Sequence, residues 1–362
     1  MLSGGGTGGH VYPALTVADE LKRGPLQAVL YVGTVGGLEA SIVTRAGVDF
    51  DAVHAAGLRG LGPAQALANG LELLRGSAQA WGIVRRFRPD VVLATGGYAS
   101  IPVVLAAWLQ RLPALIYLPD IEPGWAIRFL ARLAGRVAVS FEASLRYFPP
   151  GQAVVTGYPV RQALYTPDRQ GARERLGLAL DELTVLVFGG SRGAHSINQA
   201  VGDTLERLLG MAQVLHIAGP RDVAWLNERR AQLPPELQGR YHLYEYLYDE
   251  MVDALRAADV AVGRAGAATM GEFAALGLPS ILVPYPYSGQ HQDLNADYLV
   301  SQGAACKIRD VDLEQGALLP TLEKLLADEG ARRAMAESAH RLARQDAAQA
   351  LAEQLAQMAG GK

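Results

Sequence analysis

The chain has 362 residues, of which 50% are hydrophobic and 19% charged, and its formal net charge is −3. This length suggests about two domains, and the composition supports packed cores, which excludes a disordered or fibrous chain. The near balance of charge argues against general binding to nucleic acid. The single cysteine, Cys306, excludes an internal disulfide and a cysteine-based zinc site.

The chain starts with three residues directly before a glycine-rich segment, and this start shows neither the basic nor the apolar region of a signal peptide. Glycine loops of this kind follow buried strands, and three residues are short for a strand. We therefore expect natural apolar residues to precede Met1. The longest uncharged stretch, 91–110, is broken by Gly96, Gly97 and Pro102, so we predict a strand, a turn and a helix there and not a membrane-spanning helix.

Short apolar runs rich in β-branched residues alternate with longer helical stretches along the chain. Such continuous apolar strands between helices are typical of parallel sheets covered on both faces. We predict one series of strands at 29–33, 91–95, 114–118, 137–140 and 153–156, and a second at 185–188, 214–218, 241–244, 260–262 and 280–284. Two series predict two Rossmann-like, doubly wound domains.

The seam between these domains is expected near Gly157, which makes residues 1–157 the N-terminal domain and 158–342 the C-terminal domain. An Ala-rich, charged pattern at 318–358 predicts one or two helices that close the second domain. We expect the last helix, at about 343–362, to pack back on the first domain.

Four glycine-rich segments lie at the carboxyl ends of candidate strands, at 4–10, 95–100, 189–194 and 263–272. Ligands bind at that edge of open α/β sheets. Glycine lets the backbone approach a phosphate, and a following helix supplies N–H donors. No segment has the Gly-Lys-Ser/Thr of a Walker loop. The four together predict a cleft with a nucleotide-phosphate site in one domain and a second substrate in the other.

Polar side chains suited to a sugar nucleotide follow the fourth glycine segment. Glu272 falls about one turn into a helix, where a carboxylate can accept two ribose hydroxyls or simply complement the helix N-terminus. His291, Gln292 and Asn295 come after the next strand and offer donors and acceptors for sugar hydroxyls. Capping of a helix could explain Asn295 but not Gln292 as well.

Six motifs stand in the order and approximate spacing of the MurG family, namely GGTGGHVYPAL, TGGYAS, GYPVR, GGSRGA, GRAGAATMGEFAALGLPSILVPY and HQDLNA. From Gly4 to about Lys307 the chain resembles these UDP-N-acetylglucosamine:undecaprenyl-pyrophosphoryl-muramyl-pentapeptide transferases. The resemblance implies a GT-B fold, with two Rossmann-like domains facing a cleft, and an inverting, metal-independent reaction without a cofactor. It implies transfer of N-acetylglucosamine (GlcNAc) from UDP-GlcNAc to the C4 hydroxyl of the MurNAc of lipid I, forming lipid II.

The resemblance also assigns the substrate contacts, mainly to the second domain. Ser191 and Arg161 are expected at the donor pyrophosphate, Leu247 near the uracil and Glu272 on the ribose. The remaining expected contacts are Ala267, Ala268, Thr269 and Met270 to the phosphates, His291, Gln292 and Asn295 to the GlcNAc, and Thr7, Gly8 and Gly9 from the first domain.

His10 is the candidate general base. An inverting transfer needs a group that accepts the proton of the attacking hydroxyl, and histidine titrates in the right range. Alternatively, His10 orders its loop or binds the acceptor pyrophosphate. A helix N-terminus and an arginine can stabilise the leaving UDP without a metal. Asp-x-Asp sequences of the metal-dependent kind occur at 49–51 and 310–312, but neither is beside a glycine segment in the sequence, so we interpret both as surface acids.

One segment departs from the family, which usually carries His-Glu-Gln-Asn before a Pro-Gly. Here Tyr117 stands at the histidine and Asp120 at the asparagine, a donor-site residue in the family. Aspartate removes two donors and adds a charge. The departure leaves open a related transferase with another lipid or glycolipid acceptor. A UDP-GlcNAc 2-epimerase and a non-catalytic nucleotide-sugar-binding scaffold are further alternatives.

The segment 71–88 mixes apolar residues with arginines, and its members are Leu71, Leu73, Leu74, Trp81, Ile83 and Val84 with Arg75, Arg85, Arg86 and Arg88. This mixture suits an anionic bilayer surface, and also an ordinary amphipathic helix with solvated arginines. An undecaprenyl-linked acceptor favours the first interpretation. We expect a peripheral enzyme at the cytoplasmic face of the cell membrane, with cell-wall synthesis proteins as further partners and no nucleic acid.

Overall fold

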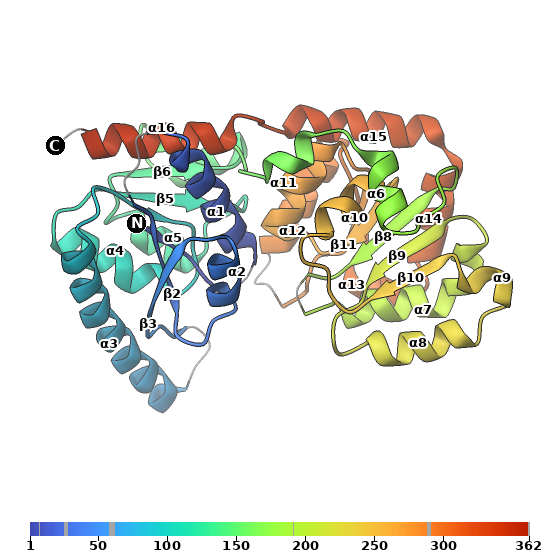
Figure 1. The fold of residues 1–362 in the computed structure, drawn as a ribbon, viewed down its shortest axis with the longest axis horizontal. Helices are drawn as coiled ribbons and strands as arrows, with labels where there is room; N and C mark the ends of the chain where they lie inside the picture. The colour runs from blue at the N-terminus through green and yellow to red at the C-terminus, as the bar shows by residue number, and fades with distance from the viewer. Residues whose placement is uncertain (7, 25–27, 58–61, 191, 288–290, 361–362) are drawn as a thin grey trace. The chain divides into compact units, whose positions relative to one another are not determined.

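The computed structural model describes residues 1–6, 8–24, 28–57, 62–190, 192–287 and 291–360. Its contacts divide the chain into unit 1, which is Met1–Arg161 with Arg344–Lys362, and unit 2, which is Gln162–Ala343. The first division follows Arg161, whereas the sequence analysis expects it after Gly157. Each unit is built around one parallel sheet with helices on both faces (Figure 1).

In the described part of unit 1, seven parallel strands stand in the order β3-β2-β1-β4-β5-β6-β7. They are β1 (Leu2–Ser3), β2 (Leu30–Thr34), β3 (Asp49–Val53), β4 (Val92–Ala94), β5 (Ala114–Leu118), β6 (Arg136–Val139) and β7 (Ala153–Val155). Ser3 of β1 pairs with Val32 on one side and Ala94 on the other. The strand order reverses there, so the first and second glycine segments leave the sheet at its topological switch point.

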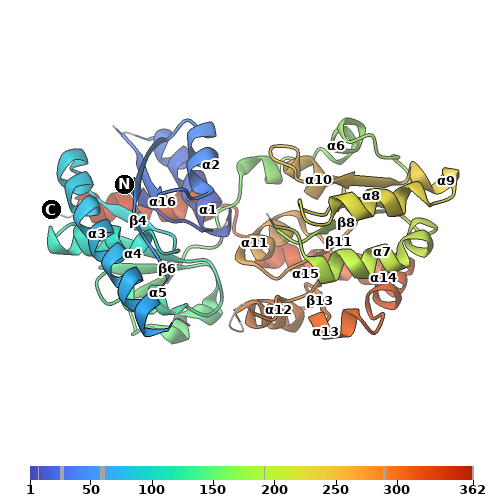
Figure 2. The same ribbon diagram turned by 90° about the horizontal axis from the view of Figure 1, so that it is seen from below.

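The helices of unit 1 form a layer on each face of this sheet (Figures 1 and 2). One layer holds α1 (Gly8–Lys22), α2 (Glu39–Arg45) and α16 (Ala347–Gly360), and the other holds α3 (Pro63–Phe87), α4 (Ser100–Leu109) and α5 (Trp125–Leu130). A short 3-10 helix, η1 (Glu142–Tyr147), precedes β7. The last helix, α16, contacts α1 and buries Leu351 and Leu355, so the two ends of the chain belong to one core.

In the described part of unit 2, six parallel strands stand in the order β10-β9-β8-β11-β12-β13. They are β8 (Thr184–Phe188), β9 (Gln213–Ile217), β10 (Tyr241–Tyr244), β11 (Val260–Gly263), β12 (Ser280–Leu282) and β13 (Cys306–Lys307). The order reverses between β8 and β11, where Val187 pairs with Val262. The third and fourth glycine segments follow these two strands, so they leave the second sheet at its own switch point.

The helices of unit 2 also cover both faces of their sheet, and the α7 helix and the α11 helix follow the two central strands (Figure 2). They are η2 (Gln162–Tyr165), α6 (Arg169–Arg175), α7 (His195–Leu209), α8 (Val223–Ala231), α9 (Pro235–Gln238), α10 (Met251–Ala257), α11 (Ala267–Leu276), α12 (His291–Ser301), α13 (Asp310–Leu313), α14 (Leu318–Ala327) and α15 (Glu329–Leu342). Val187, Leu208 and Leu322 are among the fully buried apolar residues that join sheet and helices.

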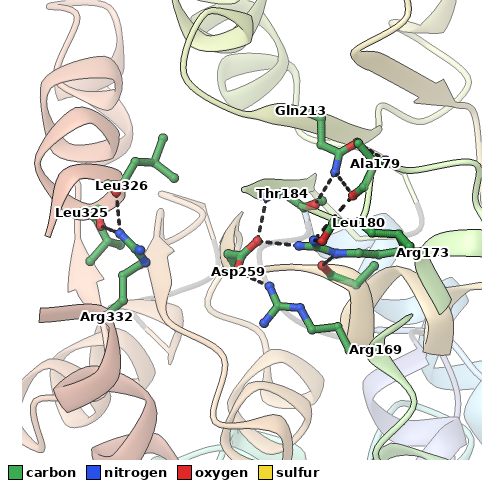
Figure 3. A network of polar contacts seen from close by, with 11 residues as sticks. Arg169, Arg173, Ala179, Leu180, Thr184, Gln213, Asp259, Leu325, Leu326 and Arg332 are labelled. Carbon is green, nitrogen blue, oxygen red and sulfur yellow. Dashed lines mark hydrogen bonds and ion pairs between the residues drawn. The ribbon is translucent and has the colours of Figure 1, made fainter. Parts of the chain in front are cut away.

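A buried ion pair anchors α6 in unit 2 (Figure 3). Arg173 is almost fully buried, and its Nη2 donates to Asp259 Oδ2 over 2.7 Å while its Nη1 donates to the Leu180 carbonyl over 2.6 Å. The same Asp259 oxygen accepts the Thr184 amide of β8. Desolvation, with the nearby Arg169 charge, lowers the pKa of Arg173. Because every charge has its partners, the pair tolerates burial.

The predicted fold class is confirmed: both domains are doubly wound parallel sheets. Three strands are absent from the two predicted series. β1 has only two residues, at the start of the chain. β3 begins with acidic residues at a half-exposed sheet edge, so it lacks the apolar run by which buried strands are recognised. β13 is a two-residue strand at the edge of the second sheet.

Candidate functional site

His10 is the last residue of the first glycine segment and lies in the first turn of α1. Its Nδ1 is 3.1 Å from the Gly5 carbonyl oxygen. A carbonyl can only accept, so Nδ1 carries the proton of this bond. In the neutral ring, Nε2 is therefore the basic atom, as a general base at this position requires.

The second glycine segment holds His10 from the other side. Thr95 Oγ1 donates to the His10 carbonyl over 2.6 Å, and Thr95 is itself buried. Gly96 has φ +110, and a Cβ at this position would lie 2.9 Å from His10 Cδ2 and 3.0 Å from Nε2. Only glycine fits this backbone and this contact without displacing the ring. Two segments that are far apart in sequence therefore position one imidazole.

A buried acid lies beneath the first glycine segment and was missed by the sequence analysis. Glu39 of α2 is 1% exposed, and its carboxylate accepts the Thr34 amide over 2.7 Å and the Gly6 amide over 3.5 Å. Tyr31 donates its hydroxyl to the Gly4 carbonyl over 3.0 Å. Burial, with the Glu39 charge nearby, raises the pKa of Tyr31, so the hydroxyl stays a donor. In the sequence Glu39 is a single acid after Gly-Gly-Leu, and this pattern does not indicate that its carboxylate binds the glycine segment.

Tyr117 and Asp120, where the sequence departs from the family, have different surroundings. Tyr117 is fully buried in β5, and its hydroxyl lies 2.7 Å from Ser140 Oγ and 3.3 Å from the Gly157 carbonyl. Burial raises the pKa of Tyr117 well above its ordinary value. Tyr117 is thus a core residue. Asp120 is partly exposed just beyond the carboxyl end of β5, the same edge as His10.

Arg161 falls in unit 1, although the sequence analysis assigns it to the donor-binding domain. Its guanidinium carbon lies 5.2 Å from the centre of the Tyr12 ring on α1, a cation–π contact. Gly8 and Gly9 begin the same helix, and the Gly9 carbonyl accepts the Tyr158 hydroxyl over 3.3 Å. Arg161 is therefore fixed next to the first glycine segment, and its expected contact with the donor pyrophosphate stays a prediction.

The fourth glycine segment supplies a helix N-terminus in unit 2. Gly266 is extended at the N-cap, and Ala267, Ala268 and Thr269 form the first turn of α11. The first backbone N–H groups of a helix have no partner within it, and they carry a partial positive charge. Met270 is fully buried, and Glu272 is partly exposed on the next turn. This arrangement suits a phosphate with a ribose beside it.

Arg264 of this segment, Ser196 and Asp310 form a polar cluster. Because Asp310 belongs to it, our interpretation of Asp310 as a surface acid is wrong. Arg264 Nη1 forms an ion pair with Asp310 and donates to the Val283 carbonyl, while Nη2 donates to Ser196 Oγ over 2.9 Å. Ser196 Oγ in turn donates to Asp310 Oδ1 over 2.7 Å. Asp310 therefore does contact a glycine segment, across 46 residues of sequence. Asp312 instead pairs with Arg309 at the surface.

The residue expected to contact the uracil lies just after β10, and the three expected to contact the GlcNAc lie on the first turns of α12. Leu247 is buried just after β10. Asn295 is fully buried, and its amide nitrogen donates to the Ala265 carbonyl over 3.0 Å. Gln292 accepts the Tyr285 amide over 2.9 Å. His291 begins α12 with a partly exposed side chain. Asn295 and Gln292 thus also support the loops that carry the site.

Thr7 and Ser191 lie outside the described residues, so their expected contacts stay predictions. Within the described ranges, no group of three or more His, Cys, Asp or Glu side chains could hold a metal ion. None of the helices in these ranges has the length and apolar character needed to span a bilayer.

The face of unit 1 formed by α3 exposes apolar side chains. Leu71, Leu74 and Trp81 are 59%, 68% and 37% exposed, and Leu67, not named in the sequence analysis, is 70% exposed. Ile83 and Val84 are buried in the core and Leu73 packs against it, so these three belong to the inner face. The neighbouring α4 adds exposed Trp108 and Leu109 at its end. We call Leu67, Leu71, Leu74, Trp81, Trp108 and Leu109 the α3 patch.

Comparison with protein families matches the N-terminal domain of glycosyltransferase family 28 at residues 1–139 and its C-terminal domain at residues 184–351. Similar curated proteins carry the name UDP-N-acetylglucosamine–N-acetylmuramyl-(pentapeptide) pyrophosphoryl-undecaprenol N-acetylglucosamine transferase. The one from Roseiflexus sp. (strain RS-1) is 44% identical, over 97% of this chain and 93% of its own. The one from Listeria monocytogenes serovar 1/2a is 39% identical, over 97% of each.

Among solved structures, MurG of Acinetobacter baumannii superposes with a TM-score of 0.75 at 27% identity, over 99% of each chain. The UDP-GlcNAc 2-epimerase of Neisseria meningitidis reaches a TM-score of 0.72 at 14% identity, over 98% of this chain and 99% of its own. At this low identity, the similarity to the epimerase shows only that the two proteins share a fold.

Proposed function

The chain belongs to glycosyltransferase family 28, and from this membership we propose that it transfers GlcNAc from UDP-GlcNAc to the C4 hydroxyl of the MurNAc of lipid I. The product is lipid II of peptidoglycan synthesis. The observation that carries the proposal is identity of 39–44% with transferases of this name over nearly the whole chain. The epimerase alternative rests on a shared fold at 14% identity and is not favoured.

In the proposed reaction His10 is the general base. The acceptor hydroxyl oxygen attacks the anomeric carbon, the bond to the UDP oxygen breaks, and His10 Nε2 takes the hydroxyl proton. The Nδ1–H bond to the Gly5 carbonyl and the contact with Gly96 support this role, because they fix both tautomer and ring position. Inversion at the anomeric carbon follows from a single displacement.

The donor contacts proposed for unit 2 stabilise the leaving UDP. The N–H groups of the first turn of α11 face developing negative charge on the pyrophosphate, without needing to reorganise as the bond breaks. Glu272 binds the ribose hydroxyls, and Leu247 packs against the uracil. Ser191 adds contacts to the pyrophosphate, and the contact expected for Arg161, a residue of unit 1, stays a prediction. Gln292 and Asn295, with His291, orient the GlcNAc. The contacts expected for Thr7, Gly8 and Gly9 stay predictions.

The direct test measures UDP release from UDP-GlcNAc with and without a short-chain lipid I analogue, followed by mass analysis of the lipid. We expect release that depends on the acceptor and a lipid heavier by one GlcNAc. UDP-GlcNAc binding without such release would assign another acceptor, and conversion of UDP-GlcNAc without any acceptor would assign the epimerase. A positive result would also make Asp120 a tolerated variation.

The role of His10 is tested by His10→Ala. We expect turnover to fall by about 10²–10⁴-fold, the usual contribution of general-base catalysis, with UDP-GlcNAc affinity nearly unchanged. The exposed His340 of α15 provides a control with the same substitution. Full turnover by the His10 variant would remove His10 from the role of base.

We also propose that the enzyme is peripheral at the cytoplasmic face of the cell membrane and that the α3 patch contacts the lipid. Exposed apolar side chains with Arg75, Arg85 and Arg88 at their side suit an anionic surface. Arg86 contributes less, because it pairs with Asp51, and Arg75 lies 4.0 Å from Glu72. Contacts with cell-wall synthesis proteins stay a prediction.

This membrane proposal is tested by sedimentation with anionic vesicles. Leu71→Ser with Leu74→Ser should reduce the bound fraction several-fold, and charge reversal at Arg85 and Arg88 should do the same at low salt. Turnover of a water-soluble acceptor should stay the same in both variants. Unchanged sedimentation would refute the α3 patch as the lipid contact.

A further inference from the structure

A chain of hydrogen bonds runs through unit 2 from its core to the surface beside the third glycine segment. Tyr241 Oη lies 2.8 Å from His216 Nδ1, and His216 Nε2 lies 2.9 Å from Asn198 Oδ1. Asn198 Nδ2 donates to Asp222 Oδ2 over 2.8 Å, and His195 Nδ1 lies 2.8 Å from Asp222 Oδ1. Tyr241, His216, Asn198 and Asp222 are buried, whereas the His195 side chain is 45% exposed.

The direction of the inner bonds follows from counting donors. Asn198 Nδ2 donates both of its hydrogens, one to Asp222 and one to the Ala218 carbonyl over 2.8 Å. Asn198 Oδ1 must therefore accept from His216 Nε2–H. Burial lowers the pKa of His216 to about 3, so the ring is neutral and its Nδ1 accepts the Tyr241 hydroxyl.

The outer end of the chain fixes how His195 is presented. Burial alone would raise the pKa of Asp222, but hydrogen bonds from Trp225, Asn198 and His195 outweigh it and hold that pKa below its usual value. The carboxylate is thus ionised and only accepts, so His195 Nδ1 carries a proton. In the part of the chain that the structure describes, His195 Nε2 has no hydrogen-bond partner. The network therefore ends in one outward imidazole nitrogen, which becomes an N–H donor when the ring is charged.

His195 stands where a phosphate of the donor is expected. It is the first residue of α7 and directly follows the third glycine segment, whose Gly193 packs against the Ala218 carbonyl of the loop after β9. Asp222 already binds Nδ1 of the ring. The loops that carry His195 and Asp222 also carry the exposed Arg192, three residues before His195, and the exposed Arg221, directly before Asp222. Asp310 is reached only through Ser196 and is paired with Arg264. The two loops thus carry two arginines and one carboxylate that is already bound to the ring, a composition that favours an anion.

We propose that His195 is a pyrophosphate ligand of the donor site, presented by Asp222, and that its protonated ring makes UDP-GlcNAc binding tighter as pH falls. This inference rests on the proposed function. A charged N–H···O⁻ bond is stronger than a neutral one, so binding and protonation of His195 strengthen each other. A network that only fastened α7 to α8 would give no such coupling.

The test is calorimetric titration of UDP-GlcNAc between pH 5.5 and 8.5, with uridine as the phosphate-free reference. The diphosphate of UDP-GlcNAc is esterified at both ends and does not titrate in this range. We expect the affinity of the unmodified protein to rise about tenfold from pH 8.5 to 5.5. His195→Gln should lose most of this rise, and uridine should show none of it. His340→Gln, an exposed histidine of the same unit, should behave like the unmodified protein.

A second variant separates presentation from contact. Asp222→Asn keeps the size of the side chain but removes the carboxylate that holds the ring through Nδ1, so the gain in affinity at low pH should become smaller. Thermal melting of each variant shows that it is folded. Equal pH dependence in His195→Gln and the unmodified protein, or the same dependence for uridine, overturns the inference while the proposed function stands. Failure of the unmodified protein to bind UDP-GlcNAc at any pH overturns both.

Discussion

The carboxyl edges of the two sheets position their loops by different means. In unit 1 the buried Glu39 carboxylate supports the first glycine segment, but His10 itself is held by a backbone carbonyl, one hydroxyl and close contact with a glycine, through Gly5, Thr95 and Gly96. In unit 2, charged side chains do this work, as Arg264 and Asp310 illustrate. We therefore expect the unit 1 site to lose activity when an atom is added in the close contact. The unit 2 site should instead lose stability and binding when a charge is removed.

The largest effect is expected from adding one carbon in unit 1. In Gly96→Ala the new Cβ would displace the His10 ring, and φ +110 strains any other residue. Displacement of a catalytic group by about 1 Å can cost 10²-fold, so we expect a fall in kcat of that order with little change in donor affinity.

The control is Gly82→Ala in α3, where a Cβ would meet nothing within 4 Å. Alanine favours a helix interior over glycine by roughly 1 kcal/mol, so this variant should be as stable or more stable and retain full turnover of a soluble acceptor. If both alanine variants kept full activity, the steric account of unit 1 would be wrong.

The second-largest effect is a loss of folding stability at low pH, caused by a buried histidine of unit 2. The pKa of His216 is about 3 in the folded protein, below its ordinary value of 6.5. Between these values the unfolded chain binds a proton that the folded chain does not, so stability falls as pH decreases from 6.5 toward 3. The loss reaches about 3 kcal/mol by pH 4.

Calorimetric melting of unit 2 between pH 7.5 and 4 measures this loss. His216→Gln should start from lower stability at pH 7.5 and show a shallower decline, because the buried group no longer titrates. The same slope in both proteins would show that His216 does not cause the acid sensitivity.

The third effect comes from removing one charge from the cluster around the fourth glycine segment. Asp310→Asn leaves Arg264 partly buried without its anion, and we expect a loss of about 1–3 kcal/mol in unfolding free energy together with weaker UDP-GlcNAc binding. Asp312→Asn is the matched control, because Asp312 pairs with exposed Arg309, and its cost should stay below about 1 kcal/mol. Equal losses in the two variants would contradict a special role for the cluster.

The smallest effect is expected at Thr95. Thr95→Val keeps the shape but removes the hydroxyl that binds the His10 carbonyl, which should cost about 1 kcal/mol of stability and lower kcat a few-fold. Thr95→Ser retains the hydroxyl and should recover kcat. If Ser and Val behaved alike in kcat, packing of the side chain and not its hydrogen bond would position His10.

The fold was largely predictable because its central strands are buried on both faces and read as continuous apolar runs. The same pattern placed the four glycine segments at strand ends, and the two sheets bring them to their switch points. Of the strands absent from the predicted series, β3 and β13 lie at sheet edges, where half-exposed or very short strands lose that pattern, and β1 has only two residues.

Membership of a family was also predictable, because six motifs in order carry it and the comparisons bear it out. The positions of single side chains were harder to predict from the sequence. Leu73, Ile83 and Val84 share a segment with exposed Leu71 and Leu74 but belong to the inner face. Helical phase, which depends on where α3 begins, decides this sorting.

The sequence alone therefore determined the two parallel sheets, the strand ends that carry the glycine segments, and the family, since these depend on local pattern and motif order. Only the tertiary structure decided the pairing of Arg264 with Asp310, of Glu39 with the first glycine segment and of His195 with Asp222. Each of these pairs joins separate elements of the chain. Hydrogen bonds and ion pairs depend on distances of a few ångströms between such elements, and no local pattern records them.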